Sequence, residues 1–196
     1  MNKRFFIGLL GLFAGLGCGG GGADDQAVLA PAAKALVYTD PSSTGWRLIK
    51  DSSSTATRVV LNLVGPAGLK ARGVSFTLQA DAKTIAFGKF DGAYLKDEGV
   101  FVLAQAPDEP KLLAGGVKGD ALMAGAFQKD RNEGAKAVDA PLFQVALELK
   151  AGGAASAGSV IPLKVQKAML LPEDISTPSK LALQPITLEL GKLVAQ

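Results

Sequence analysis

Apolar and polar residues alternate over short stretches of this chain, which is the pattern of strands that bury one face. In residues 74–79, Val74, Phe76 and Leu78 alternate with polar neighbours, and residues 58–64 and 142–150 repeat the pattern. No long stretch shows the period of an amphipathic helix. Shorter or less regular strands are expected at residues 36–38, 46–50, 84–90, 100–104, 112–117, 122–127, 160–165 and 186–190.

Turn-forming residues separate these stretches. Asp40–Gly45, Gly65–Gly68 and Lys118–Asp120 combine Gly, Pro, Asp or Ser, and residues 171–178 read as a proline-containing loop. Pro162 indicates a strand edge or a bulge, and the glycines of residues 112–127 indicate bulges or close backbone approach. Many short strands with frequent turns predict an all-β domain, an antiparallel β-sandwich, over residues 35–196.

The first seventeen residues have the layout of a secretory leader. Lys3 and Arg4 precede a mostly apolar run, residues 5–16, which is shorter than the roughly 20 residues that a membrane-spanning helix needs. Small residues then lead to Cys18, the one cysteine of the chain. The segment resembles a bacterial lipobox, with Leu16 one place later than usual. Residues 1–17 are therefore expected to be a lipoprotein signal peptide and Cys18 to be lipidated. The alternative is an ordinary signal peptide with an incidental cysteine.

A linker is expected to join this anchor to the domain. Residues 18–34 are rich in Gly, Ala and Asp, a composition typical of a flexible tether. Gly19 follows the cysteine where inner-membrane lipoproteins usually carry Asp, so resemblance to that class implies an outer-membrane lipoprotein. Buried acyl chains, at about 0.8 kcal/mol per CH₂, would hold it stably. The membrane leaflet is left open.

Composition excludes several kinds of chemistry. Histidine is absent and cysteine occurs once, which removes Ser–His–acid catalysis, Cys–His catalysis and thiolate metal sites. The formal charge of +3 falls to +1 without Lys3 and Arg4, leaving 19 basic against 18 acidic residues (21 minus 2 against 18). No basic stripe with interleaved aromatics occurs, so nucleic acid is not an expected partner. The chain is not expected to be an enzyme; a carboxylate pair that hydrolyses glycosides is the remaining catalytic alternative.

Three stretches resemble the cohesin and carbohydrate-binding-module group of β-sandwiches: Gly73–Leu78 followed by Ala80-Asp81, Pro141–Lys150, and Gly158–Leu163. The resemblance implies a jelly-roll sandwich that binds, without catalysis, an envelope or secreted protein or a polysaccharide. A structural or assembly lipoprotein without a small ligand is the alternative. Residues 37–48 depart from the usual cohesin pattern and only one module is present, which argues against a dockerin as the partner.

Aromatic side chains suggest a sugar-binding surface. If Tyr38 and Trp46 are neighbours across a hairpin and exposed, they would form a platform on which pyranose rings stack. The alternative is that Trp46 fills the core or an edge of the sandwich.

Oxygen-bearing side chains suggest a calcium loop. Asp130, Asn132 and Glu133, with Asp139 nearby, offer the hard ligands that Ca²⁺ prefers, although Gly134 comes one place too early for the calcium-loop pattern. The alternative is a solvated loop, and no cofactor is otherwise expected. Three adjacent acidic pairs are expected to be turn or loop charges, because neighbouring strand residues point to opposite faces: Asp97-Glu98, Asp108-Glu109 and Glu173-Asp174.

Overall fold

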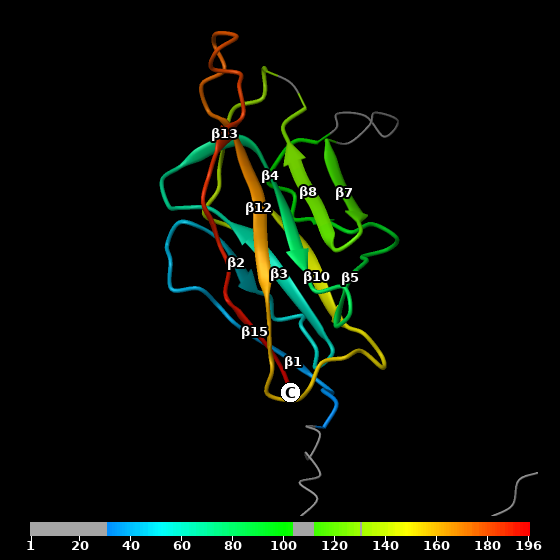
Figure 1. The fold of residues 1–196 in the computed structure, drawn as a ribbon. Coiled ribbons are helices and arrows are strands. Elements are labelled where there is room, and N and C mark those ends of the chain that lie inside the picture. The colour runs from blue at the N-terminus through cyan, green and yellow to red at the C-terminus, as the bar shows by residue number, and fades with distance from the viewer. Residues whose placement is uncertain (1–30, 104–111, 130) are drawn as a thin grey trace, which may run out of the picture.

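The structure, a computed structural model, describes residues 31–103, 112–129 and 131–196 and forms only β-strands there (Figure 1). The strands are β1 (Leu36–Thr39), β2 (Trp46–Lys50), β3 (Arg58–Val64), β4 (Lys70–Ala80), β5 (Ile85–Gly88), β6 (Lys96–Asp97), β7 (Leu113–Lys118), β8 (Ala121–Phe127), β9 (Lys136–Ala137), β10 (Phe143–Leu149), β11 (Val160–Ile161), β12 (Leu163–Pro172), β13 (Gln184–Pro185), β14 (Leu188–Glu189) and β15 (Lys192–Ala195). Within these ranges no helix is long and apolar enough to cross a bilayer.

Two larger sheets pack face to face, as the sequence predicted (Figure 1). The first has the strand order β14-β2-β3-β10-β5, and β6 also pairs with β10. The second has the order β13-β12-β4-β8-β7, and β9 also pairs with β4. A small third sheet, β1-β15-β11, joins the beginning of the domain to its end. Every pairing is antiparallel except that of β14 with β2, so the predicted antiparallel β-sandwich is confirmed.

The core lies between the two larger sheets. Alternate residues of all four central strands, β3, β10, β4 and β8, point into this core, and β3 and most of β10 are buried on their other face as well. Across the layer the rings of Phe76 and Phe143 stack with centroids 5.8 Å apart. Each fully buried aliphatic or aromatic side chain stabilises the fold by roughly 1.5–3 kcal/mol. The buried alternating residues are Val59, Leu61, Leu63, Val74, Phe76, Leu78, Leu122, Phe143, Val145 and Leu147.

The strand predicted at residues 160–165 is split and longer than expected. Pro162 separates β11, which pairs with β15, from β12, which pairs with β4, so the chain changes sheets at the residue that lacks an N–H. Between Val165 and Lys167 the register with β4 shifts, and Ala168 and Leu170 become the buried positions. This bulge reverses the alternation, so the sequence did not reveal that β12 continues to Pro172. The loop predicted from residue 171 is wrong for its first two residues.

Other departures concern pairing rather than burial. Residues 100–103 form no strand, yet Phe101 and Leu103 are buried, so their apolar pattern reflects packing. The closing strand predicted at 186–190 is reduced to β14, and the strand that closes the small sheet is β15. The two-residue strands β6, β9 and β13 were not predicted, because two residues are too short to show a period.

Both ends of the described domain lie at the same end of the sandwich (Figure 1). Ala32 forms a bridge with Ser156, and the backbone N–H of Lys34 donates to the carbonyl of Gln196 at 2.5 Å. The expected leader, residues 1–17, and Cys18 lie outside the described residues.

Adjacent glycines of β7 differ in their surroundings. A Cβ at Gly115 would lie 2.1 Å from Leu95 Cδ1, whereas a Cβ at Gly116 would meet nothing within 4 Å. Neither glycine is among the residues with positive φ. The close backbone approach predicted for this segment is therefore confirmed at Gly115.

We expect Gly115→Ala to lower the free energy of unfolding by about 1–3 kcal/mol, because its methyl group overpacks against the buried Leu95 side chain. Gly116→Ala is the matched control and should leave stability unchanged or raise it by about 0.4–1 kcal/mol. Urea unfolding of both variants measures this. Equal midpoints would show that β7 does not press on Leu95.

Candidate functional site

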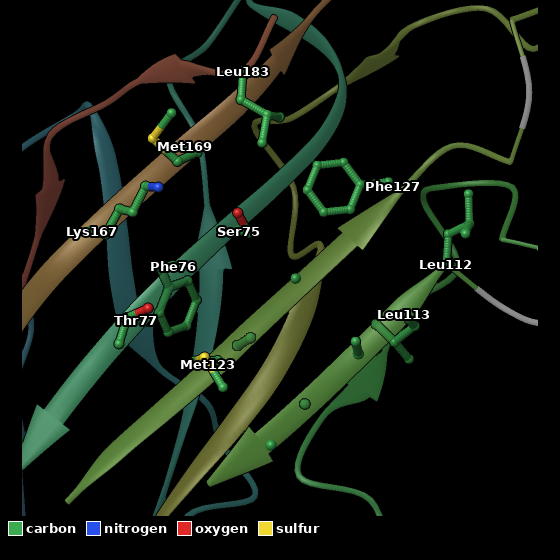
Figure 2. A pocket seen from close by; sticks show the side chains of 15 residues that line it. Ser75, Phe76, Thr77, Leu112, Leu113, Met123, Phe127, Lys167, Met169 and Leu183 are labelled. Atoms are coloured by element: carbon green, nitrogen blue, oxygen red, sulfur yellow. The ribbon is translucent and has the colours of Figure 1, made fainter. Parts of the chain in front are cut away.

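An apolar hollow of about 670 Å³ lies on the outer face of the β12-β4-β8-β7 sheet (Figure 2). Three of its apolar side chains are strongly exposed: Met123 at 52%, Leu183 at 46% and Leu112 at 40%. Polar groups are few, and Lys167 is the one charged residue among those that line it. The remaining lining residues are Ser75, Phe76, Thr77, Leu113, Ala114, Gly115, Gly116, Ala124, Gly125, Phe127 and Met169.

The strand pattern decides which side chains face the hollow. On β4 the core residue Phe76 turns inward, so Ser75 and Thr77 point outward (Figure 2). On β8 the same alternation turns Met123 and Phe127 outward. β8 is therefore apolar on both faces, whereas the outer face of an antiparallel sheet is ordinarily polar.

Two glycines make room for the Phe127 ring over the sheet. A Cβ at Gly73, the cross-strand partner of Phe127, would lie 2.1 Å from its Cδ1 atom. A Cβ at Gly125, two residues before Phe127, would lie 3.2 Å from its Cε2 atom. Because both positions lack a side chain, the ring lies over the backbone and presents its other side to the hollow. This gives the hollow a fixed aromatic floor.

The hollow is suited to binding rather than to bond chemistry. Ser75 and Thr77 supply hydroxyl groups, but no carboxylate stands among the lining residues to act as a base. What the surface offers is apolar area, two polarizable methionine side chains and a few hydrogen-bonding groups. Exposed apolar patches of this kind mark sites where another molecule docks.

The exposed platform expected around Trp46 is not formed. Tyr38 and Trp46 are 5% and 6% exposed, so neither ring presents a face to solvent. The Tyr38 hydroxyl donates to the carbonyl of Leu48 at 3.0 Å and accepts from the N–H of Gly191 at 2.6 Å. Burial raises the pKa of Tyr38 to about 12, although the bond from Gly191 opposes this rise. Trp46 packs beside Gly65, where a Cβ would lie 3.0 Å from the indole. The prediction of a surface platform is wrong because both rings fill the interior.

The loop with the calcium-ligand candidates is organised by an arginine. Arg72 Nη1 donates to the backbone carbonyls of Arg131 and Glu133, and Arg72 Nε donates to the carbonyl of Glu173 at 2.8 Å. The backbone carbonyl oxygens of this loop, which could otherwise bind a metal cation, therefore accept hydrogen bonds from the Arg72 guanidinium. Asn132 and Glu133 belong to this loop, and Asp130 lies outside the described residues. Among those described, no group of three or more acidic side chains is placed to hold a metal. Calcium binding stays a prediction.

Three of the four described acidic side chains of the predicted pairs serve local structure. Asp97 accepts from the N–H of Gly99, Glu98 pairs with Lys96 at 3.2 Å, and Asp174 pairs with Lys180 at 2.5 Å. The pair Asp108-Glu109 lies outside the described residues.

Two other carboxylates, Asp81 and Asp120, line one shallow hollow at the end of the sandwich. Asp81 accepts from the N–H of Lys83 at 3.0 Å and from Thr84, and Asp120 accepts from Gln79 at 2.5 Å. These bonds hold turns, which is the structural use of aspartate at such positions.

Sequence reasoning missed the hollow itself. The available signal was β8, where Met123 and Phe127 occupy the face that Ser75 and Thr77 occupy on β4. A strand that is apolar on both faces beside an amphipathic strand indicates either complete burial or a docking surface. Nothing in the sequence indicated that Leu183 lines the hollow, because Leu183 lies in a loop more than fifty residues after β8.

Comparison with known proteins finds similarity in structure alone. No protein-family model matches the chain, and no curated protein matches its sequence. The sixth cohesin from scaffoldin B of Acetivibrio cellulolyticus, solved in complex with a Cel5 dockerin, matches with a TM-score of 0.53 at 12% identity, over 76% of this chain and 95% of that one. The CaCohA2 module of Clostridium acetobutylicum, solved in the CaDoc0917–CaCohA2 complex, matches with a TM-score of 0.50 at 10% identity, over 78% and 99%. The fold is a cohesin-like jelly-roll β-sandwich.

We expect Tyr38→Phe to lower the free energy of unfolding at neutral pH by about 1–3 kcal/mol, because the partly buried N–H of Gly191 loses its acceptor. Gly191 itself is closely packed, since a Cβ there would lie 2.0 Å from the Thr39 carbonyl oxygen. Chemical unfolding of both proteins measures the difference.

The difference should also depend on pH. The folded chain keeps the Tyr38 proton up to a pKa of about 12, whereas the unfolded chain loses it near the ordinary tyrosine pKa of 10.0. The stability that this group contributes is present below pH 10 and is lost as pH rises toward 12. The difference in unfolding free energy between the wild type and Tyr38→Phe should therefore become smaller as pH rises from 10 to 12. A difference that stays constant over this range would contradict the conclusion that burial raises the pKa of Tyr38.

Proposed function

We propose that this protein is a non-catalytic lipoprotein of the bacterial envelope whose β-sandwich binds a protein partner at the hollow on the β12-β4-β8-β7 sheet. The observation that carries the proposal is the exposed apolar surface formed by Met123, Leu183, Leu112 and Phe127. Such a patch, rimmed by polar residues, is the form that a protein-docking surface takes.

A protein suits this surface better than a glycan does. Sugar-binding faces stack rings on exposed Trp or Tyr, and both candidates for such a platform, Trp46 and Tyr38, are buried. The hollow instead combines a fixed Phe127 ring with adaptable Met123 and Met169, a set that accepts apolar side chains of a partner. The similar cohesin of Acetivibrio cellulolyticus was solved with a dockerin bound, which supports a protein as the ligand class.

The anchor is the second part of the proposal. Cys18 follows a leader-like segment and precedes Gly19, an arrangement that favours lipidation and the outer membrane. The domain begins within about fifteen residues of that cysteine, so acylation would hold it close to the bilayer.

Replacing Met123 by Glu should weaken partner binding by about 30-fold or more, because a carboxylate would be desolvated at the centre of the interface. Met123 is 52% exposed, so the fold should tolerate the change. Val160→Glu is the matched control, since Val160 is 55% exposed but lies outside the hollow. Affinity capture from envelope extract with the wild type and both variants, followed by titration of the purified partner, measures the effect.

The proposal requires a partner that the wild type and Val160→Glu bind, that Met123→Glu loses, and that soluble glycans do not displace. Equal binding by all three proteins would show that the hollow is not part of the interface. Glycan-array binding by the wild type that Met123→Glu leaves unchanged would instead favour a carbohydrate ligand bound elsewhere on the domain.

Cys18→Ser should convert the protein from a membrane-bound to a soluble form, because the acyl acceptor is lost. Fractionation of envelope and soluble material, with mass spectrometry of the N-terminal peptide, tests this. A wild-type chain without acyl groups would show Cys18 to be incidental.

A further inference from the structure

The strand β7 ends the second sheet without the protection that edge strands usually have. Among the described residues it pairs with β8 alone (Figure 1). It is six residues long, whereas β13, at the other edge of this sheet, has two residues and contains Pro185. Natural edge strands are commonly short or carry proline or charge, which discourages pairing with another chain. β7 has no proline, and its one charged residue, Lys118, is the last of the strand. This edge is therefore open to a further strand.

The hydrogen-bond pattern shows which backbone groups of β7 face the free edge. The N–H of Phe127 donates to the carbonyl of Leu112 at 2.8 Å, one step beyond the register of β7 with β8. In an antiparallel pair every second residue bonds the neighbouring strand, and the residues between them turn their N–H and C=O groups the other way. The residues of β7 that turn these groups to the free edge are therefore Leu113, Gly115 and Val117. Gly115 and Val117 are also exposed.

The outer side of β7 is almost bare of side chains. Ala114 and Gly116 face outward there, and a Cβ at Gly116 would meet nothing within 4 Å. Next to them on β8 stand the outward side chains of Met123, which aligns with Gly116, and Phe127 (Figure 2). A strand added beside β7 would lie about 4.8 Å away, so its large side chains would extend over the two small residues into the hollow. Aromatic residues stabilise the glycines of edge strands in this way.

A second, smaller hollow of about 190 Å³ lies on the inner side of β7. Val117 aligns with the core residue Leu122, so its side chain faces inward, and it lines this hollow together with Phe87 and Tyr94. Phe87 belongs to β5, the edge strand of the opposite sheet, so the hollow lies between the edges of the two sheets. Because successive side chains of a strand point to opposite faces, an added strand would offer alternate residues to the two hollows.

We propose that the protein partner binds by adding an extended segment of its own as an antiparallel strand beside β7. The segment carries large apolar residues opposite Gly116 and Ala114, a small residue between them, and an acidic residue opposite Lys118. The proposal rests on the proposed function, since it names the part of the partner that occupies the hollow. In this mode of recognition, backbone hydrogen bonds supply affinity and the hollows on either side of the strand supply selectivity.

A second copy of this chain fits the edge less well than such a segment. Two β7 strands paired about Gly115 would place Ala114 of each copy opposite Gly116 of the other. Small residues would then meet small residues on the outer face, and the hollow would stay empty. The bare outer side of β7 calls for large side chains, which β7 itself does not carry there.

The test uses the full chain in detergent and two synthetic hexapeptides with blocked ends. The first, Glu-Val-Phe-Ala-Phe-Thr, places both phenylalanines on one face of a strand. The second, Glu-Val-Ala-Phe-Phe-Thr, has the same composition but places them on opposite faces. We expect the first peptide to bind about tenfold or more tightly than the second, as measured by calorimetric titration. Met123→Glu should abolish this difference, because the phenylalanines lose their apolar contact.

Hydrogen exchange read at single residues gives a signature that only an added strand produces. In the free chain the N–H groups of Ala114 and Gly116 bond β8, whereas those of Gly115 and Val117 face the free edge. Binding of the first peptide should slow exchange at Gly115 and Val117 by about tenfold or more. A ligand that lies on the sheet face without adding a strand would leave exchange at these two N–H groups unchanged.

Two substitutions at Val117 separate its backbone from its side chain. Val117→Pro removes one N–H from the free edge without removing a bond to β8, and it should weaken binding of the first peptide by about tenfold or more. Val117→Ala is the matched control, because it keeps the N–H, and it should bind within about threefold of the wild type.

Equal binding of the two peptides would overturn the proposal, as would unchanged exchange at Gly115 and Val117. Protection of these N–H groups that rises with protein concentration in the absence of peptide would assign the edge to a second copy and overturn it too. An envelope partner that Met123→Glu loses but Val117→Pro keeps overturns the added strand while the proposed function stands. A partner that both variants keep overturns the proposed function as well.

Discussion

The contact between β3 and β10 on one side and β4 and β8 on the other is the constraint on which the rest of the molecule depends. Alternate residues of these four strands are buried against each other, with the stacked rings of Phe76 and Phe143 at the contact. Because a strand sends successive side chains to opposite faces, this burial also fixes which residues face outward. Met123 and Phe127 reach the surface because Leu122, Ala124 and Ala126 are in the core. The hollow is therefore a consequence of the same packing that stabilises the fold.

The sequence predicted the features of the fold and of the hollow that depend on local pattern, and it missed those that depend on contacts between residues far apart in the chain. Alternation in the residues of β3, β4 and β10 let the sequence predict these strands and the sandwich, whereas β8, which is apolar on both faces, was expected only as a less regular strand. β12 was truncated in prediction because a bulge near Gln166 reverses the alternation, and nothing local announces a bulge. Tyr38 was placed on the surface because its two partners, Leu48 and Gly191, are ten and 153 residues away. Leu183 was also missed, because it lines the hollow together with residues of β4, β7 and β8 that are distant from it in the sequence.

The outer face of the β12-β4-β8-β7 sheet combines order with exposure. An exposed phenylalanine ordinarily moves among rotamers, but Gly73 and Gly125 let the Phe127 ring lie on the backbone between them. A surface that is already ordered loses less conformational entropy when a partner binds. The side chains of Met123 and Met169, which also line the hollow, are flexible, so rigid and adaptable parts share one surface.

The pairing of β1 with β15 has a consequence for the order in which the chain folds. Leu36 aligns with Ala195, and Trp46 of β2 aligns with Leu188 of β14, so the first two strands pair with strands more than 140 residues later in the sequence. Contacts so distant in sequence form slowly. A chain that emerges from its N-terminus cannot close this sandwich until nearly all of it is available. Such a topology delays completion of the sandwich until the strands at both ends of the described domain are present together.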